Sequence, residues 1–150
     1  FNSVREIKTP VLLHVFTKKG IKSSKAEKDS IKYYSLSGAK KDNSVGVSYS
    51  EIVGKSLIKA NPENNNFKCI TAAMDIGTGI KEFCEKYPDK YIDVGIAESH
   101  AVSYASGLST EGIVPVITIY STFMQRAYDQ IMHDILLQDI KLPGCYILKY

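Results

Sequence analysis

The chain has 150 residues, of which 44% are hydrophobic and 23% charged, with a formal net charge of +3. This is the composition of an ordinary globular domain, and no apolar run approaches the roughly 20 residues of a membrane-spanning helix. The positive charge comes from scattered lysines, and the densest group, residues 18–32, also contains acids and no alternating aromatics. We therefore expect neither a membrane span nor a nucleic-acid partner.

The cysteines Cys69, Cys84 and Cys145 form no C-x-x-C pair, and the three histidines lie far apart. Two of the cysteines, Cys69 and Cys145, sit in strand-like runs. We therefore expect buried free thiols in a reducing compartment. No zinc-ligand spacing occurs, so we expect no metal site within this chain.

The first apolar run, residues 9–16 (TPVLLHVF), predicts a buried strand. Residues 17–47 have no sustained period and are rich in Lys, Ser, Gly, Asp and Asn. A connection of this length is unusual inside a compact domain, so we expect it to link two domains.

A helix is predicted after this connection. Ser48 and Glu51 have capping-box spacing, so we expect Ser48 to cap the helix and Glu51 to bond back to it. The expected apolar face consists of Ile52, Val53, Leu57 and Ala60.

Strands and helices then alternate to the end of the chain. Strands are predicted at residues 67–71, 91–94, 114–120 and 145–148, and helices at 79–86, 97–110 and 122–138. The strands are continuous apolar runs, which is typical of parallel strands covered on both faces. We predict an open, mostly parallel, doubly wound α/β sheet. Its ligands should bind beyond the carboxyl ends of the strands, where loops begin near Thr71, Val94 and Tyr120.

The first two of these loops contain candidate site residues. Gly77 and Gly79 allow either close backbone approach to a ligand or a plain turn. Glu98 opens a helix whose next residues look buried: Ala101, Val102, Ala105 and Leu108. A carboxylate in an apolar layer is costly unless it is hydrogen-bonded or protonated. The alternative is a glutamate stabilised only by the helix dipole.

The third loop places Tyr120, Phe123 and Arg126 at or just beyond a strand end. The following helix has an expected core stripe of Met124, Tyr128, Ile131 and Ile135. Phe123 lies off this stripe, so it either packs under a neighbouring loop or faces a ligand.

Several strings resemble the 1-deoxy-D-xylulose-5-phosphate synthase family, among them PVLLHVFTKKG, YSEIVGKSLI, YPDKYIDVGIAESHAVSYASGL and IYSTFMQRAYDQIMHDI. The resemblance runs from about residue 10 to residue 143 and implies an internal piece of a thiamine-diphosphate-dependent transferase. That family condenses pyruvate with D-glyceraldehyde 3-phosphate and releases carbon dioxide, the first step of non-mevalonate isoprenoid precursor synthesis. The alternatives are another transketolase-like thiamine enzyme and a non-catalytic α/β partner module.

The resemblance also implies residue roles. Glu98 matches the catalytic glutamate that bonds N1′ of the cofactor's aminopyrimidine, and Phe123 matches the aromatic residue that stacks on this ring. Tyr120 matches a pocket position directed toward substrate, and Arg126 either lines the same wall or holds its helix in place. The roles of Lys18 and Lys19 stay open.

The resemblance implies that the chain contains parts of two domains. Residues 1–47 would be the end of the diphosphate-binding domain and an interdomain linker, and residues 48–150 an incomplete pyrimidine-binding domain. The Mg²⁺ ligands would lie outside this piece, which we expect to be inactive alone.

The resemblance further implies a homodimer, in the bacterial cytoplasm or in a plastid-type organelle. Small residues on the helix at 97–110, among them Ala105 and Gly107, would lie at the subunit interface. The chain departs from the family at residues 21–25, at Ser99, where the family has Gln, and at its last segment, GCYILKY.

Overall fold

The computed structural model describes residues 2–33, 46–61, 66–141 and 144–148. The chain divides into two compact units, Phe1–Ser44 and Val45–Tyr150. Within the described ranges, no helix is long and apolar enough to cross a membrane.

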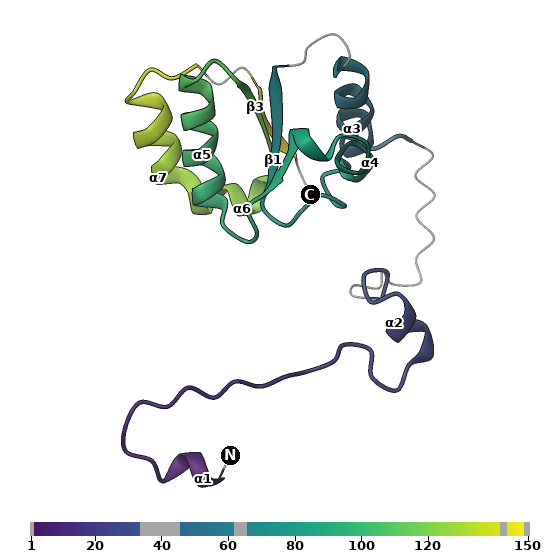
Figure 1. The fold of residues 1–150 in the computed structure, drawn as a ribbon, viewed down its shortest axis with the longest axis vertical. Coiled ribbons are helices and arrows are strands. Elements are labelled where there is room, and N and C mark those ends of the chain that lie inside the picture. Colours follow the sequence, from purple (N-terminus) through teal and green to yellow (C-terminus); the bar gives the residue numbers. More distant parts are fainter. Residues whose placement is uncertain (1, 34–45, 62–65, 142–143, 149–150) are drawn as a thin grey trace. The chain divides into compact units, whose positions relative to one another are not determined.

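The first unit contains two short helices, α1 (Asn2–Arg5) and α2 (Ser24–Lys28) (Figure 1). The buried strand predicted at residues 9–16 is wrong, because Leu12 is 94% and Phe16 86% exposed. A strand needs a neighbour to satisfy its backbone groups. The described sheet pairs other segments of the chain and offers none to this run.

Helix α2 lies inside the stretch that we predicted to be an irregular connection. Ser23 caps it by accepting a hydrogen bond from the Ala26 N–H at 3.4 Å. Glu27 bonds to the Lys18 ammonium at 2.9 Å and to the Lys22 N–H at 3.2 Å. Local capping therefore gives this part of the connection a defined turn of helix, while residues 34–45 lie outside the described part.

The second unit is built on a four-stranded parallel sheet in the order β2-β1-β3-β4. Its strands are β1 (Phe67–Thr71), β2 (Tyr91–Asp93), β3 (Val114–Tyr120) and β4 (Gly144–Leu148). The predicted open parallel sheet is confirmed. All four carboxyl ends consequently meet at one edge, with Thr71 of β1 level with Asp93 of β2.

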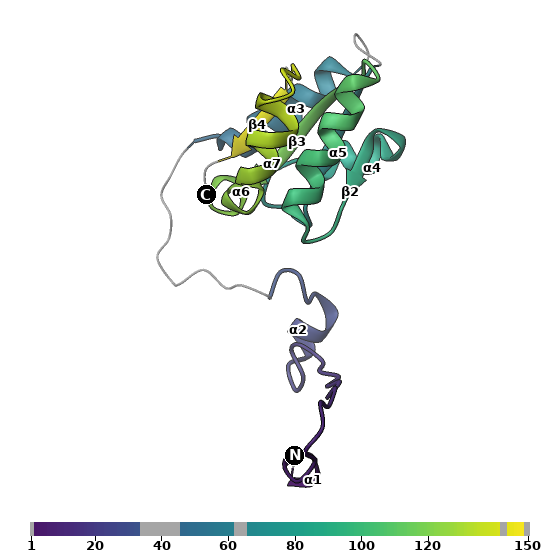
Figure 2. The same ribbon diagram turned by 90° about the vertical axis from the view of Figure 1, so that its left-hand side faces the viewer.

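Helices cover both faces of this sheet (Figures 1 and 2). On one face α3 (Tyr49–Ala60) and α4 (Lys81–Lys86) enclose a core of Leu57, Phe67, Cys69, Ile80, Phe83, Cys84 and Val116. On the other face α5 (Glu98–Thr110) and the helical run after β3 pack on Ile70, Ile117 and Ile119. A short 3₁₀ turn, η1 (Pro88–Lys90), leads into β2. The doubly wound arrangement is confirmed.

The start of α3 agrees with the prediction only in part. Ser48 accepts a hydrogen bond from the Glu51 N–H at 3.2 Å, as expected of an N-cap. The Glu51 carboxylate does not bond back to it but pairs with Lys55 at 2.6 Å. The exposed ammonium one turn away is the stronger partner, because it carries a full charge.

The apolar face predicted for α3 is also shifted. Gly54 and Leu57 are buried, whereas Ile52 is 47% exposed; the expected core residue Ala60 is exposed too. A Cβ at position 54 would clash with the carbonyl oxygen of Gly79. Glycine lets the helix backbone lie directly on this loop, which turns the face around Gly54 toward the core.

The helix predicted at residues 122–138 is a run of four differently wound segments. They are α6 (Ser121–Met124), the 3₁₀ turn η2 (Gln125–Ala127), α7 (Tyr128–Gln130) and the π-helical η3 (Ile131–Leu136). Because η2 is wound more tightly than an α-helix, the position that faces the core moves from residue 128 to residue 127. Ala127 is therefore fully buried while the predicted core residue Tyr128 is 63% exposed. The wider π turns restore the phase, and Ile135 is buried as predicted.

The small residues of α5 pack within their own domain. Ala101 and Ala105 are fully buried. Ser106 donates to the Asp134 carbonyl at 2.7 Å, and Ser103 donates to the Asp134 carboxylate. These contacts bring η3 close to α5, so the expectation that Ala105 lies at a subunit interface is wrong; Gly107 faces open space.

Candidate active site

The loops that follow β1, β2 and β3 meet at the carboxyl edge of the sheet, where α6 continues directly from β3 (Figure 1). Asp93, at the end of β2, joins two of these loops. Its Oδ1 accepts hydrogen bonds from the Ala73 and Gly95 N–H groups, both at 2.8 Å. Ala73 has a φ of 58°, an uncommon conformation for alanine that this bond helps to hold.

Glu98 is the first residue of α5, and its side chain is only 3% exposed. A charged group in such a place requires a partner. Arg126 provides one, because its Nη1 donates to Glu98 Oε1 at 3.3 Å and to Oε2 at 3.4 Å. The helix N-terminus adds a favourable dipole. Glu98 is thus a buried carboxylate satisfied by a side chain from a distant part of the sequence.

Arg126 lies in η2 and also contacts the aromatic residue beside it. Its guanidinium carbon lies 5.6 Å from the ring centroid of Phe123, a cation–π distance. The Phe123 and Tyr120 rings are stacked at 6.0 Å with an interplanar angle of 30°. The structure therefore brings the four predicted residues together in one row, from Glu98 through Arg126 and Phe123 to Tyr120.

Ser99 is a member of this cluster that sequence reasoning did not assign. Its hydroxyl donates to the main-chain carbonyl of Arg126 at 2.7 Å. The residue adjacent to Glu98 therefore anchors the backbone of Glu98's own ion-pair partner. The only signal in the sequence was the departure from the family at this position.

The two glycines of the first loop serve packing inside the domain. A Cβ at Gly77 would clash with the hydroxyl of Tyr120, so glycine makes room for that side chain. Gly79 has a φ of 77°, and a Cβ there would clash with the Ser50 carbonyl oxygen at the start of α3. Both glycines lie against protein groups, and close approach to a ligand stays a prediction.

The buried thiols are expected to be unreactive at neutral pH. Cys69 and Cys84 are free and buried, as expected for Cys69, and burial raises the pKa of each to about 12. They therefore remain protonated at neutral pH. The side chain of Cys145 lies outside the described part of the chain.

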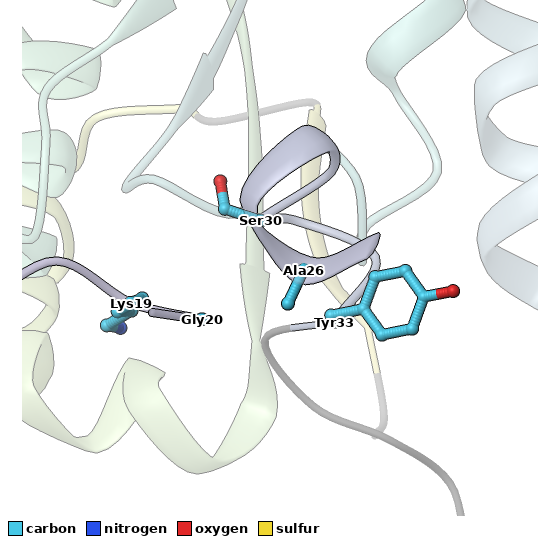
Figure 3. Close-up of a pocket in the computed structure, with 5 residues that line it drawn as sticks. All are labelled: Lys19, Gly20, Ala26, Ser30 and Tyr33. Atoms are coloured by element: carbon cyan, nitrogen blue, oxygen red, sulfur yellow. The ribbon is translucent and has the colours of Figure 1, made fainter. Parts of the chain in front are cut away.

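Neither a hollow in the first unit nor a metal-binding group offers a better site in the described part of the chain. A hollow of about 490 Å³ in the first unit is lined by Lys19, Gly20, Ala26, Ser30 and Tyr33 (Figure 3). Among these described lining residues there is no carboxylate, thiol or histidine. In the described residues, no group of three or more His, Cys, Asp or Glu side chains could hold a metal ion. The sheet edge around Glu98 is therefore the candidate active site.

The chain is similar to proteins of known family. The family described as "Transketolase, pyrimidine binding domain" matches residues 45–148. Among the similar curated proteins are three called 1-deoxy-D-xylulose-5-phosphate synthase. The one from Magnetococcus marinus is 45% identical over 92% of this chain and 23% of its own length. That from Alkaliphilus oremlandii is 44% identical over 98% and 24%, and that from Dehalococcoides mccartyi 48% over 93% and 22%.

A solved structure is also similar. It is called "Split gene transketolase, inactive beta4 tetramer", with a TM-score of 0.54 and 30% identity over 60% of this chain and 30% of that chain. The chain spans about a quarter of the length of its curated relatives. With the family matched over residues 45–148, on a doubly wound parallel sheet, the chain belongs to the transketolase pyrimidine-binding domain family.

Proposed function

We propose that this chain is the pyrimidine-binding part of a 1-deoxy-D-xylulose-5-phosphate synthase. That enzyme is a thiamine-diphosphate-dependent transferase that joins pyruvate to D-glyceraldehyde 3-phosphate with loss of carbon dioxide. The relatives that carry this name support the proposal at 44–48% identity over more than nine tenths of the chain. The observation that carries it is the buried Glu98 carboxylate and the partly exposed Phe123 ring, which are linked by Arg126.

These residues fit the aminopyrimidine of thiamine diphosphate. A flat, nitrogen-containing ring needs a hydrogen-bonding group at its edge and an apolar surface on its face. Glu98 offers the first, and Phe123, which is 38% exposed, offers the second. Arg126 now contacts both, but its side chain is 55% exposed and can move without disturbing the core.

In this proposal the protein contributes proton transfer and positioning. Glu98 exchanges a proton with N1′ of the pyrimidine, and its burial keeps water from competing for that proton. Phe123 holds the ring by stacking, and Tyr120 forms the wall toward substrate, braced against Gly77. When bound, the cofactor supplies the nucleophilic carbon and the electron sink for decarboxylation.

The remaining parts of the cofactor site are proposed to lie elsewhere. Residues 1–47 would end a diphosphate-binding domain and link it to the pyrimidine-binding domain at 48–150. The ligands of Mg²⁺ and the diphosphate would belong to the former domain, outside this chain. The 150-residue chain alone is then inactive, and the similar structure named as an inactive tetramer of a split-gene transketolase supports this view.

Assembly and location follow from the same proposal. We propose a homodimeric enzyme in the bacterial cytoplasm, since the relatives named above come from bacteria. A plastid-type organelle is the alternative.

The test is an activity assay on the full-length protein with thiamine diphosphate and Mg²⁺. Product formation from pyruvate and D-glyceraldehyde 3-phosphate, with one carbon dioxide released per product, is expected. Transfer of a two-carbon unit from a ketose phosphate without carbon dioxide release would identify another transketolase-like enzyme. Cofactor binding without turnover would indicate a non-catalytic module.

A further inference from the structure

Arg126 contacts both groups that the proposed function assigns to the cofactor. Its Nη1 lies 3.3 Å and 3.4 Å from the two carboxylate oxygens of Glu98. Its guanidinium carbon lies 5.6 Å from the ring centroid of Phe123. A planar cation thus bonds to the acid and covers the aromatic ring, the two contacts that a bound aminopyrimidine would also make.

The two ends of Arg126 are held very differently. Its main-chain carbonyl is anchored by the Ser99 hydroxyl at 2.7 Å, within the turn η2. Its side chain is 55% exposed, whereas that of Glu98 is 3% exposed. The guanidinium can therefore move into solvent while its backbone stays in place, but Glu98 cannot follow it.

The ion pair stabilises the buried Glu98 carboxylate when no cofactor is bound. A carboxylate buried to this extent is destabilising unless its charge is compensated. Arg126 compensates it from the solvent side, where the arginine itself loses little hydration. Any ring that bonds to Glu98 must then take over that role.

We propose that Arg126 is a displaceable placeholder, which pairs with Glu98 and covers Phe123 until the aminopyrimidine of thiamine diphosphate takes its position. This inference rests on the proposed function. The ring can bind only when Arg126 is in its open position. The apparent affinity for the cofactor is therefore the intrinsic affinity multiplied by the fraction of molecules in which Arg126 is open. A half-exposed ion pair and a cation–π contact favour the closed position by about threefold to tenfold.

Calorimetry with thiamine diphosphate and Mg²⁺ on the full-length protein provides the first test. The Arg126→Met variant keeps the length of the side chain and removes its charge, so it should bind the cofactor about threefold to tenfold more tightly. Lys81→Met is the matched control, since Lys81 forms an exposed ion pair with Glu85 at 3.7 Å and loses the same charge. The affinity of Lys81→Met for the cofactor should equal that of the wild type.

The same comparison in a Glu98→Gln protein tests the contact between Arg126 and Glu98. In a Glu98→Gln protein only the contact with Phe123 still holds Arg126 in the closed position. Arg126→Met should therefore raise the affinity by a smaller factor than it does in the wild-type background. If Arg126→Met reduces the amount of folded protein, Arg126→Lys replaces it, because lysine keeps the charge but loses the planar fork. This variant should bind the cofactor more tightly than the wild type.

NMR of the 150-residue chain tests the pair without any cofactor. The sequence has two arginines, Arg5 and Arg126, so their side-chain Nε–Hε signals are easily assigned. Glu98→Gln should move the Arg126 signal toward that of the exposed Arg5. An unchanged signal would overturn the proposal.

The outcomes separate the placeholder from the proposed function. If the wild type binds the cofactor and Arg126→Met binds it equally or more weakly, the placeholder is refuted and the proposed function stands. If the wild-type full-length protein does not bind thiamine diphosphate at all, the proposed function fails, and the placeholder with it.

Discussion

Replacing Glu98 by glutamine removes a proton-exchanging group from a buried site while keeping the shape of the side chain. The proposed function requires Glu98 to exchange a proton with the cofactor pyrimidine, and an amide cannot do so. The hydrogen–deuterium exchange at C2 of bound thiamine diphosphate should therefore slow by about 10²–10⁴-fold, the usual contribution of a positioned proton-transfer group.

The same substitution should leave the fold nearly unchanged. The ion pair with Arg126 is half in solvent on the arginine side, so its loss should lower the free energy of unfolding by no more than about 1 kcal/mol. Cofactor affinity should change far less than the exchange rate, because the stacking surface of Phe123 remains.

The assay is NMR of the full-length protein with thiamine diphosphate, with acid quenching at several pD values. Glu51→Gln is the matched control, because it breaks an exposed ion pair, with Lys55, on a different helix. A Glu98→Gln protein that binds the cofactor and exchanges C2 at the wild-type rate would refute the reasoning. Glu98 would then be no more than a helix-start carboxylate.

The remaining predictions concern the domain itself. Ala105→Leu should lower the free energy of unfolding by about 1–3 kcal/mol, because position 105 is fully buried. Gly107→Ala, in open space on the same helix, should be neutral or stabilising in the same denaturant titration; equal effects would contradict the packing. Hydrogen bonds from Ser103 and then the neighbouring histidine lower the pKa of Asp134. Its contribution to stability is thus present above the unfolded pKa of about 3.9 and lost as pH falls through the folded value. Ser103→Ala should therefore flatten the loss of stability below about pH 4, and an unchanged profile would argue against the bond. In a Cys145→Ser background, the two buried thiols should react with a disulfide reagent at pH 8 about 10²–10³-fold more slowly in native than in unfolded protein. Comparable rates would mean that the thiols are accessible.

The parallel sheet could be predicted from the sequence because its strands are short, continuous apolar runs. The same rule failed for residues 9–16, whose apolar run is just as clear. A strand forms only where another strand can pair with it, and pairing depends on residues distant in sequence. Local pattern alone therefore could not distinguish this run from β1.

The site was predictable in its members but not in its contacts. Glu98 stood out because a glutamate opens a helix of apolar residues, and Phe123 because it lies off the core stripe. The 3₁₀ turn that buries Ala127 in place of Tyr128 leaves no signal in the apolar period. The ion pair between Glu98 and Arg126 and the anchoring by Ser99 likewise depend on how α5 and η2 meet in space.

The double hydrogen bond accepted by Asp93 has a consequence for motion near the site. One carboxylate oxygen bonds the amides of both Ala73 and Gly95, which belong to the loops after β1 and β2. When this oxygen moves away, both amides lose their partner in the same event. Their exchange with solvent deuterium should thus report one shared opening free energy rather than two, so the two loops beside Glu98 behave as a single cooperative unit.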